Sequence, residues 1–137
     1  MEELAELFEG RTALVEQLAQ LEDPLGRARD VARGLSEAEQ KEVLDAHPAI
    51  GAKPTSARSA AEQGTDDDPA VLAELAALNR AYEDRFGFRF VVFVNRRPRR
   101  EIVRVLKERI DRSRAEELTT AVDELVQIAI DRWHGGR

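Results

Sequence analysis

Two histidines and one glutamate are the residues of this chain best suited by type and position to acid–base chemistry. An imidazole exchanges a proton near neutral pH because its unperturbed pKa is about 6.5. His47 lies where a helix must end, directly before Pro48, and catalytic residues concentrate in loops held on a rigid scaffold. The structural alternative is a histidine that interacts with the dipole at a helix C-terminus. The other histidine, His134, lies beside Gly135 and Gly136, where we expect it to be exposed.

The second candidate is Glu62, in the segment Ser59-Ala60-Ala61-Glu62. This spacing is that of a capping box, in which a serine and a glutamate together start a helix. A carboxylate at the same place could also orient an imidazole. The pattern alone leaves both interpretations open.

Several other kinds of site lack any signal in the sequence. There is no cysteine, which excludes disulfides, thiolate nucleophiles and cysteine-based zinc sites. No His-x-x-x-His pair, EF-hand loop, GxxxxGK loop or Gly-x-Ser-x-Gly elbow occurs, and no GxGxxG motif follows a strand. We therefore expect neither a metal ion nor an organic cofactor.

The charge balance restricts the partners. With 21 basic and 27 acidic residues the formal net charge is -6, which disfavours a nucleic-acid partner, because the phosphate backbone attracts clustered positive charge. The one basic cluster, Arg96 to Arg100, is expected in a turn. The N-terminus lacks the pattern of a signal peptide, and the apolar run from Phe90 to Val94 is far shorter than the roughly 20 residues that span a bilayer. We expect a cytoplasmic protein without a membrane partner.

Apolar residues recur at steps of three and four along most of the chain, a pattern typical of amphipathic helices. The expected helices cover residues 2–22 with a break near Gly10, 24–34, 36–47, 56–63, 69–86, 102–110 and 118–133. The run from Phe90 to Val94 is β-branched and aromatic, but a lone strand would have nothing to pair with. The sequence therefore predicts an all-α fold of about six to eight helices, without significant sheet, in a single compact domain over residues 1–137.

Three sequence blocks occur in a characteristic order. They are His47-Pro48-Ala49-Ile50-Gly51, Ser59-Ala-Ala-Glu62-Gln63, and the long block from Leu78-Asn79 through Tyr82, Arg85 and Phe86 to Val92. In this order they resemble the 2-oxo-4-hydroxy-4-carboxy-5-ureidoimidazoline (OHCU) decarboxylase family. The corresponding family blocks read His-Pro-Asp-Leu, Ser-x-x-Glu-Gln and Leu-Asn-x-x-Tyr-x-x-Arg/Lys-Phe-Gly-Phe-Pro-Phe. The chain departs from them at Ala49, where the family usually has aspartate, and at Arg89, where it usually has proline.

The resemblance implies an enzyme of urate catabolism that converts OHCU to (S)-allantoin by decarboxylation without a cofactor. It assigns the catalytic roles to His47 and Glu62. The positions that correspond to substrate-binding residues are Pro48, Ser59, Gln63, Phe90, Val91, Val92 and Arg132. The family also tends to dimerise, so the resemblance implies a homodimer.

Two alternatives remain open at this stage. The chain could be a non-catalytic helical interaction domain that uses the Arg96–Arg100 turn or an exposed apolar stripe, with His47 and Glu62 acting only as caps. It could also keep the same site and act on a related ureido or hydroxy acid, given the departures at Ala49 and Arg89.

Overall fold

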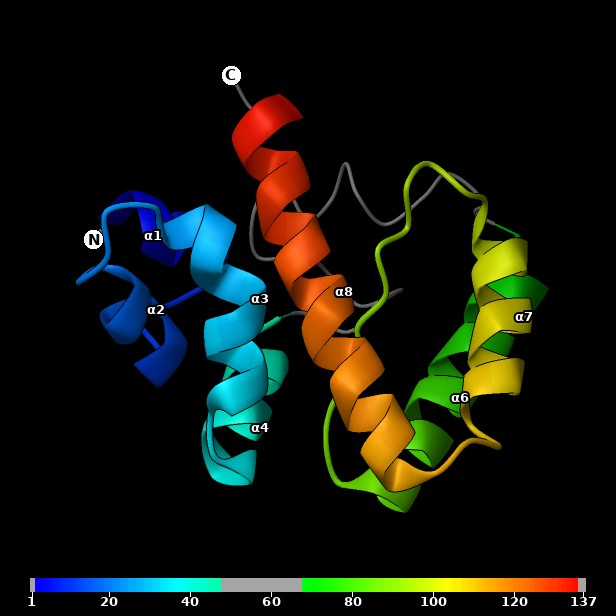
Figure 1. The fold of residues 1–137 in the computed structure, drawn as a ribbon. Helices are drawn as coiled ribbons and strands as arrows, with labels where there is room; N and C mark the ends of the chain where they lie inside the picture. The colour runs from blue at the N-terminus through cyan, green and yellow to red at the C-terminus, as the bar shows by residue number, and fades with distance from the viewer. Residues whose placement is uncertain (1, 48–67, 136–137) are drawn as a thin grey trace.

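The computed structural model describes residues 2–47 and 68–135. Within these two ranges the chain forms seven helices and no strand, which confirms the predicted all-α class (Figure 1). The helices are α1 (Glu2–Leu7), α2 (Ala13–Leu18), α3 (Pro24–Gly34), α4 (Glu37–Asp45), α6 (Pro69–Phe86), α7 (Arg99–Arg109) and α8 (Arg114–Gly135). The predicted short helix at 56–63 lies outside the described residues.

The helix starts follow the local signals in the sequence. A capping box starts α4 at Ser36: its hydroxyl accepts from the Glu39 N–H at 3.2 Å, and the Glu39 carboxylate accepts from the Ser36 N–H at 3.0 Å. At α6 the Asp68 carboxylate accepts from the Ala70 N–H at 2.9 Å, with Pro69 in the first turn. The same helix ends at Gly87, whose φ of 81° lies in the left-handed region that favours glycine.

The long helix α8 is the centre of the fold. It packs against α1, α3 and α4 on one side of the view in Figure 1, and α6 and α7 pair with each other on the other side. Its buried face includes Val122, Leu125 and Ala129, as the apolar spacing predicts. On α6, however, the apolar Leu72 and Leu78 are only partly buried, whereas the polar Asn79 is buried.

The segment between α6 and α7 resolves the ambiguous apolar run. It is irregular rather than a strand, and its side chains from Phe88 to Val94 are buried except for the partly buried Arg89 and Phe93. Tyr82 contacts the rings of Phe88 and Phe90 edge to face, at centroid distances of 5.9 and 5.1 Å. Hydrophobic burial therefore holds this segment in place without a partner strand.

No helix within the described ranges is both long and apolar enough to cross a membrane.

Candidate active site

His47 lies just beyond the last turn of α4. Its backbone N–H donates to the carbonyl of Leu44, three residues earlier, at 3.2 Å, so the backbone of His47 continues the end of the helix. The side chain is only 5% exposed, and its Nε2 atom is buried with no hydrogen-bond partner among the described residues. A buried polar atom without a partner costs free energy, so such an atom calls for an explanation beyond packing.

The surroundings of His47 favour the neutral imidazole. Burial is the main cause and lowers its pKa from 6.5 to about 4, and the positive charges of Arg132 and Arg89 act in the same direction. The carboxylate of Glu9 opposes them by raising the pKa. At neutral pH the ring is therefore uncharged and able to accept a proton.

This pKa shift predicts an acid-sensitive stability. The unfolded chain takes up a proton near pH 6.5 whereas the folded chain does so only near pH 4, so the free energy of unfolding falls as the pH drops through that window. The expected loss between pH 7 and pH 4.5 is on the order of 2 kcal/mol. Urea unfolding at both pH values should show a smaller loss in His47→Asn than in the wild type. An equal loss in the two proteins would contradict the buried neutral state, and the exposed His134 provides the control through His134→Asn.

Arg132 lies one helical step after Ala129 on α8 and faces inward, on the same side as the buried apolar residues. Its side chain is 3% exposed, and its Nη2 lies 2.9 Å from the carboxylate of Glu9, which is 10% exposed. Its Nη1 donates to the Leu7 carbonyl at 3.0 Å. The guanidinium thus joins α8 to the chain just after α1, in a buried ion pair close enough to His47 to influence its pKa.

Sequence reasoning did not identify Glu9 as part of this site. The residue adopts a φ of 62°, a left-handed conformation that is uncommon outside glycine. Because its partner lies 123 positions away along the chain, no local spacing could have revealed the pair. The only available signal was the break of helical pattern at Glu9-Gly10, which marks where the chain leaves α1.

Phe90, Val91 and Val92 are buried and form one apolar wall, the Phe90–Val92 wall, while their predicted role in substrate binding stays a prediction. Within the described ranges, no group accepts a hydrogen bond from their backbone N–H groups. The Val91 carbonyl accepts from Arg109 Nη1 at 2.9 Å, and the same guanidinium lies 4.6 Å from the centre of the Phe90 ring. Arg109 therefore holds the Val91 carbonyl. The backbone N–H groups of Phe90, Val91 and Val92 can still donate to other acceptors.

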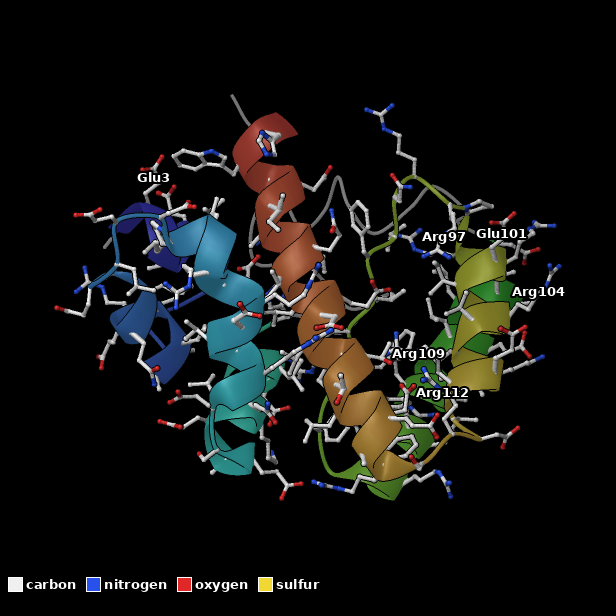
Figure 2. The ribbon with its side chains drawn as sticks, in the orientation of Figure 1. Glu3, Arg97, Glu101, Arg104, Arg109 and Arg112 are labelled. Carbon is white, nitrogen blue, oxygen red and sulfur yellow. The ribbon has the colours of Figure 1, made fainter. Side chains whose placement is uncertain are left out.

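A buried polar network supports Arg109 from behind. Glu117 is fully buried and accepts from Arg109 Nε at 2.8 Å, from the Tyr82 hydroxyl at 2.6 Å and from Arg112 at 3.0 Å. Figure 2 shows Arg109 and Arg112 side by side next to α8. Burial and the bond to Glu117 raise the pKa of Tyr82, so this hydroxyl is a permanent donor. The burial of Glu117 could not be predicted from the sequence, because an acidic residue in the first turn of a helix is usually exposed.

Four predicted site residues, Pro48, Ser59, Glu62 and Gln63, lie outside the described residues. The structure therefore brings together His47, Arg132 and the newly identified Glu9, and it leaves the predicted roles of the other four as predictions. In the described part of the chain, no group of three or more His, Asp or Glu residues could hold a metal ion.

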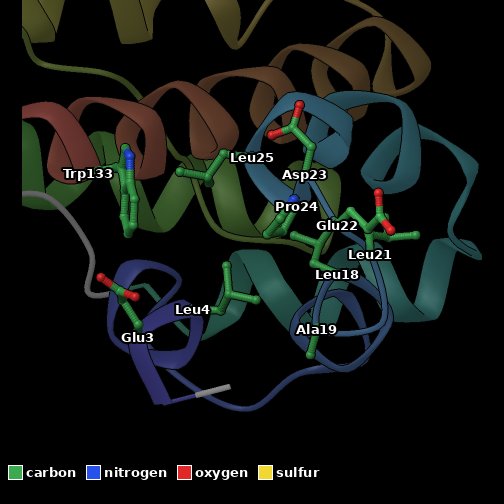
Figure 3. Close-up of a pocket in the computed structure, with 10 residues that line it drawn as sticks. All are labelled: Glu3, Leu4, Leu18, Ala19, Leu21, Glu22, Asp23, Pro24, Leu25 and Trp133. Atoms are coloured by element: carbon green, nitrogen blue, oxygen red, sulfur yellow. The ribbon is translucent and has the colours of Figure 1, made fainter.

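A cavity of about 490 Å³ lies at another place in the fold (Figure 3). It is bounded by α1, α2, α3 and the end of α8, and Leu4 and Trp133 project into it. Three carboxylates, those of Glu3, Glu22 and Asp23, line it, so an anionic ligand would be repelled. It contains none of the predicted site residues.

Comparison with known proteins supports the resemblance seen in the sequence blocks. The family model described as OHCU decarboxylase matches residues 1–134. A 2-oxo-4-hydroxy-4-carboxy-5-ureidoimidazoline decarboxylase of Halalkalicoccus jeotgali is 35% identical over 99 residues, which are 69% of this chain and 56% of that protein. A uric acid degradation bifunctional protein of Arabidopsis thaliana is 34% identical over 97 residues, or 64% of this chain and 30% of that protein.

The fold agrees with these matches. A crystal structure of OHCU decarboxylase in the presence of (S)-allantoin superposes with a TM-score of 0.81 at 26% identity, covering 96% of this chain and 95% of that one. The match to the Halalkalicoccus protein spans little more than half of that relative's length. The family model nevertheless covers nearly every residue of the sequence. The chain belongs to the OHCU decarboxylase family.

Proposed function

We propose that this protein decarboxylates OHCU to (S)-allantoin in urate degradation. The observation that carries the proposal is His47, a buried imidazole that is neutral at pH 7 and whose Nε2 has no hydrogen-bond partner within residues 2–47 and 68–135. A family relative whose crystal structure was determined in the presence of (S)-allantoin shares the fold over 96% of the chain.

The proposed reaction needs little from the protein apart from positioning and proton movement. The substrate carries a hydroxyl and a carboxylate on one ring carbon, next to a conjugated C=N. When the bond to the carboxylate breaks, CO2 leaves and the electron pair forms a C=C bond to the neighbouring carbon, while the C=N pair moves to the nitrogen, which takes up a proton. The hydroxyl then loses its proton to become a carbonyl, and the neighbouring carbon takes up a proton on one face, which sets the (S) configuration.

His47 is suited to take the hydroxyl proton because its lowered pKa keeps the imidazole in the basic form. A pKa of about 4 also makes the imidazolium a stronger acid than an ordinary histidine, so the ring can return a proton to the adjacent carbon. We assign Glu62 to the orientation of this imidazole or of the ring N–H groups. Pro48, Ser59 and Gln63 complete the proposed substrate contacts.

Arg132 and the wall at Phe90–Val92 would bind the polar groups of the substrate. A guanidinium offers five donors in a planar fork, so Arg132 can keep Glu9 and Leu7 and still contact a carboxylate or a ring carbonyl. The N–H groups of Phe90, Val91 and Val92 would serve the ring oxygens. These contacts would hold the carboxylate out of the ring plane. In that position the C–C bond to the carboxylate is parallel to the π orbital of the C=N, which favours decarboxylation.

The test is the rate at which freshly generated OHCU disappears, followed by its ultraviolet absorbance with and without the protein. The proposal predicts a rate proportional to protein concentration and unchanged after dialysis against a strong chelator. Spontaneous decay at the same rate in both samples would refute the activity. Turnover only with another ureido or hydroxy acid would support the related-substrate alternative.

Glu62→Gln tests whether the carboxylate takes part in the chemistry. Glutamine also serves in a capping box, so a purely structural Glu62 should tolerate the change in both stability and rate. We expect a normal melting temperature and the loss of most of the turnover. Melting curves and rates measured on one preparation distinguish the two roles. Unchanged turnover would show that Glu62 only caps a helix.

We also propose that the protein is cytoplasmic, as its residue composition and N-terminal pattern indicate, and that it is a homodimer, as the family resemblance implies. Light scattering coupled to size exclusion should give twice the mass of the 15.4 kDa chain, and a monomer mass would contradict this proposal.

A further inference from the structure

Arg89 connects the end of α4 to the segment between α6 and α7. Its Nη1 donates to two main-chain carbonyls, that of Asp45 at 3.1 Å and that of His47. Its Nε donates to the Glu83 carboxylate at 3.1 Å. Its backbone N–H donates to the Asp45 carboxylate, also at 3.1 Å. One residue thus makes four hydrogen bonds, three of which reach positions more than 40 residues away.

These contacts satisfy carbonyl groups at the C-terminal end of α4. The last carbonyls of an α-helix have no partner within the helix, and a positive charge there is favoured by the helix dipole. Arg89 supplies both the donors and the charge at the C-terminus of α4. A proline at this position would have neither the guanidinium nor the N–H, so it could make none of the four bonds.

The bond to the His47 carbonyl has a consequence for the site. Arg89 directly precedes the Phe90–Val92 wall in the chain, so the guanidinium ties the backbone of His47 to the start of that wall. The imidazole is buried beside it and can shift little on its own. The separation between the proposed base and the proposed substrate-binding amides is therefore set in large part by Arg89.

Among the described residues, the charged groups that act on His47 come from three places. Arg132 lies on α8, Glu9 follows α1, and Arg89 follows α6. Arg132 is fixed by its bond to Glu9, whose charge partly offsets it. Arg89 is partnered with Glu83, and its side chain is 29% exposed, so solvent screens part of its field. Arg89 therefore acts on His47 in two ways, through a partly screened positive charge and through its hydrogen bond to the His47 carbonyl.

We propose that Arg89 is a positioning residue for His47, one that fixes the imidazole relative to the Phe90–Val92 wall and holds a positive charge beside it. This inference rests on the proposed function for its catalytic consequence. The contact between Arg89 and His47 is tested separately from turnover.

Two variants separate charge from geometry. Arg89→Lys keeps the positive charge. It cannot reach two carbonyls and a carboxylate at once, because all three N–H donors of an ammonium lie on one nitrogen atom. Arg89→Gln removes the charge and shortens the side chain. Arg80→Gln is the matched control, since Arg80 is an exposed arginine on the same helix as Glu83.

The first measurement is the titration of His47 by NMR of the imidazole between pH 8 and pH 4.5, in a His134→Asn background that leaves one histidine. Removal of a nearby cation raises the pKa of a histidine, so Arg89→Gln should show a larger protonated fraction at pH 4.5 than the wild type. Arg89→Lys and Arg80→Gln should titrate as the wild type does. A wild-type titration in Arg89→Gln would overturn the proposal, and this result does not depend on any activity.

The second measurement is the split between kcat and KM. Small displacements of a reacting group lower the rate steeply, so Arg89→Lys and Arg89→Gln should lower kcat roughly tenfold, with KM within about twofold. A lower melting temperature with unchanged kcat would show that Arg89 only tethers the helix and would overturn the proposal. If Arg89→Gln does not fold, the kcat of Arg89→Lys decides the matter in the same way. If the wild type itself lacks turnover, the proposed function fails while the titration still decides the contact.

Discussion

We expect His47→Asn to lower kcat/KM at least about 100-fold, the lower range for removal of an acid–base group. Asparagine is smaller and polar, and it cannot take up a proton at any accessible pH. The folded state should persist, because the variant removes an imidazole that is already neutral and whose Nε2 makes no hydrogen bond to any residue that the structure describes. Steady-state rates with fresh substrate and a melting curve on the same sample provide the measurement.

His134→Asn is the control for this variant. It changes the other histidine, which is exposed near the end of α8, and should leave the rate almost unchanged. More than about a tenth of wild-type activity in His47→Asn would contradict the assignment of His47 as the acid–base group.

Replacement of Arg132 should have the largest effect on stability. In Arg132→Met the carboxylate of Glu9 would lose its buried ion pair with Arg132, and the Leu7 carbonyl would lose the hydrogen bond from Arg132 Nη1. Breaking one side of a buried pair costs about 3–5 kcal/mol, so we expect a loss of this size in the free energy of unfolding. Urea unfolding at pH 7 measures it.

The double variant Glu9→Gln/Arg132→Met separates the structural role of Arg132 from its proposed role in binding. With the buried charge removed, the double variant should regain much of the lost stability. If Arg132 also grips the substrate, kcat/KM should remain at least tenfold low, which is about 1.4 kcal/mol of lost transition-state binding. Recovery of both stability and rate would make Arg132 a structural residue only.

The elements that the sequence predicted well are those with local causes. The ends of α4 and α6 follow from Ser36 with Glu39, from Asp68 with Pro69, and from Gly87, all of which act within a few residues. The inward direction of Arg132 follows from the helical step after Ala129. Such features are set by backbone geometry and require no knowledge of distant neighbours.

The features that escaped prediction depend on contacts between distant parts of the chain. Glu9 meets Arg132 from the other end of the molecule, and Arg89 reaches His47 across 42 positions. Glu117 has the sequence signature of an exposed acidic residue in a first helical turn. It is fully buried because Tyr82, Arg109 and Arg112 surround it in three dimensions.

The roles of Pro48, Ser59, Glu62 and Gln63 stay predictions from the resemblance, since these residues lie outside the described ranges. His47, Arg132 and Phe90–Val92 lie within the described ranges, and their roles in catalysis and binding are likewise proposals. The buried imidazole, the adjacent guanidinium and the apolar wall could not be joined by spacing alone, because they come from three segments separated by more than 35 residues each.

The most direct test of the central claim is the circular dichroism of the product formed from OHCU that is generated in place by the two upstream reactions from urate. An enzyme that delivers a proton to one face must give optically active allantoin, whereas spontaneous decay gives a racemate with no signal. We predict rapid growth of the (S)-allantoin signal with the wild-type protein and its near absence with His47→Asn. Racemic allantoin formed at the spontaneous rate with the wild-type protein would contradict the claim.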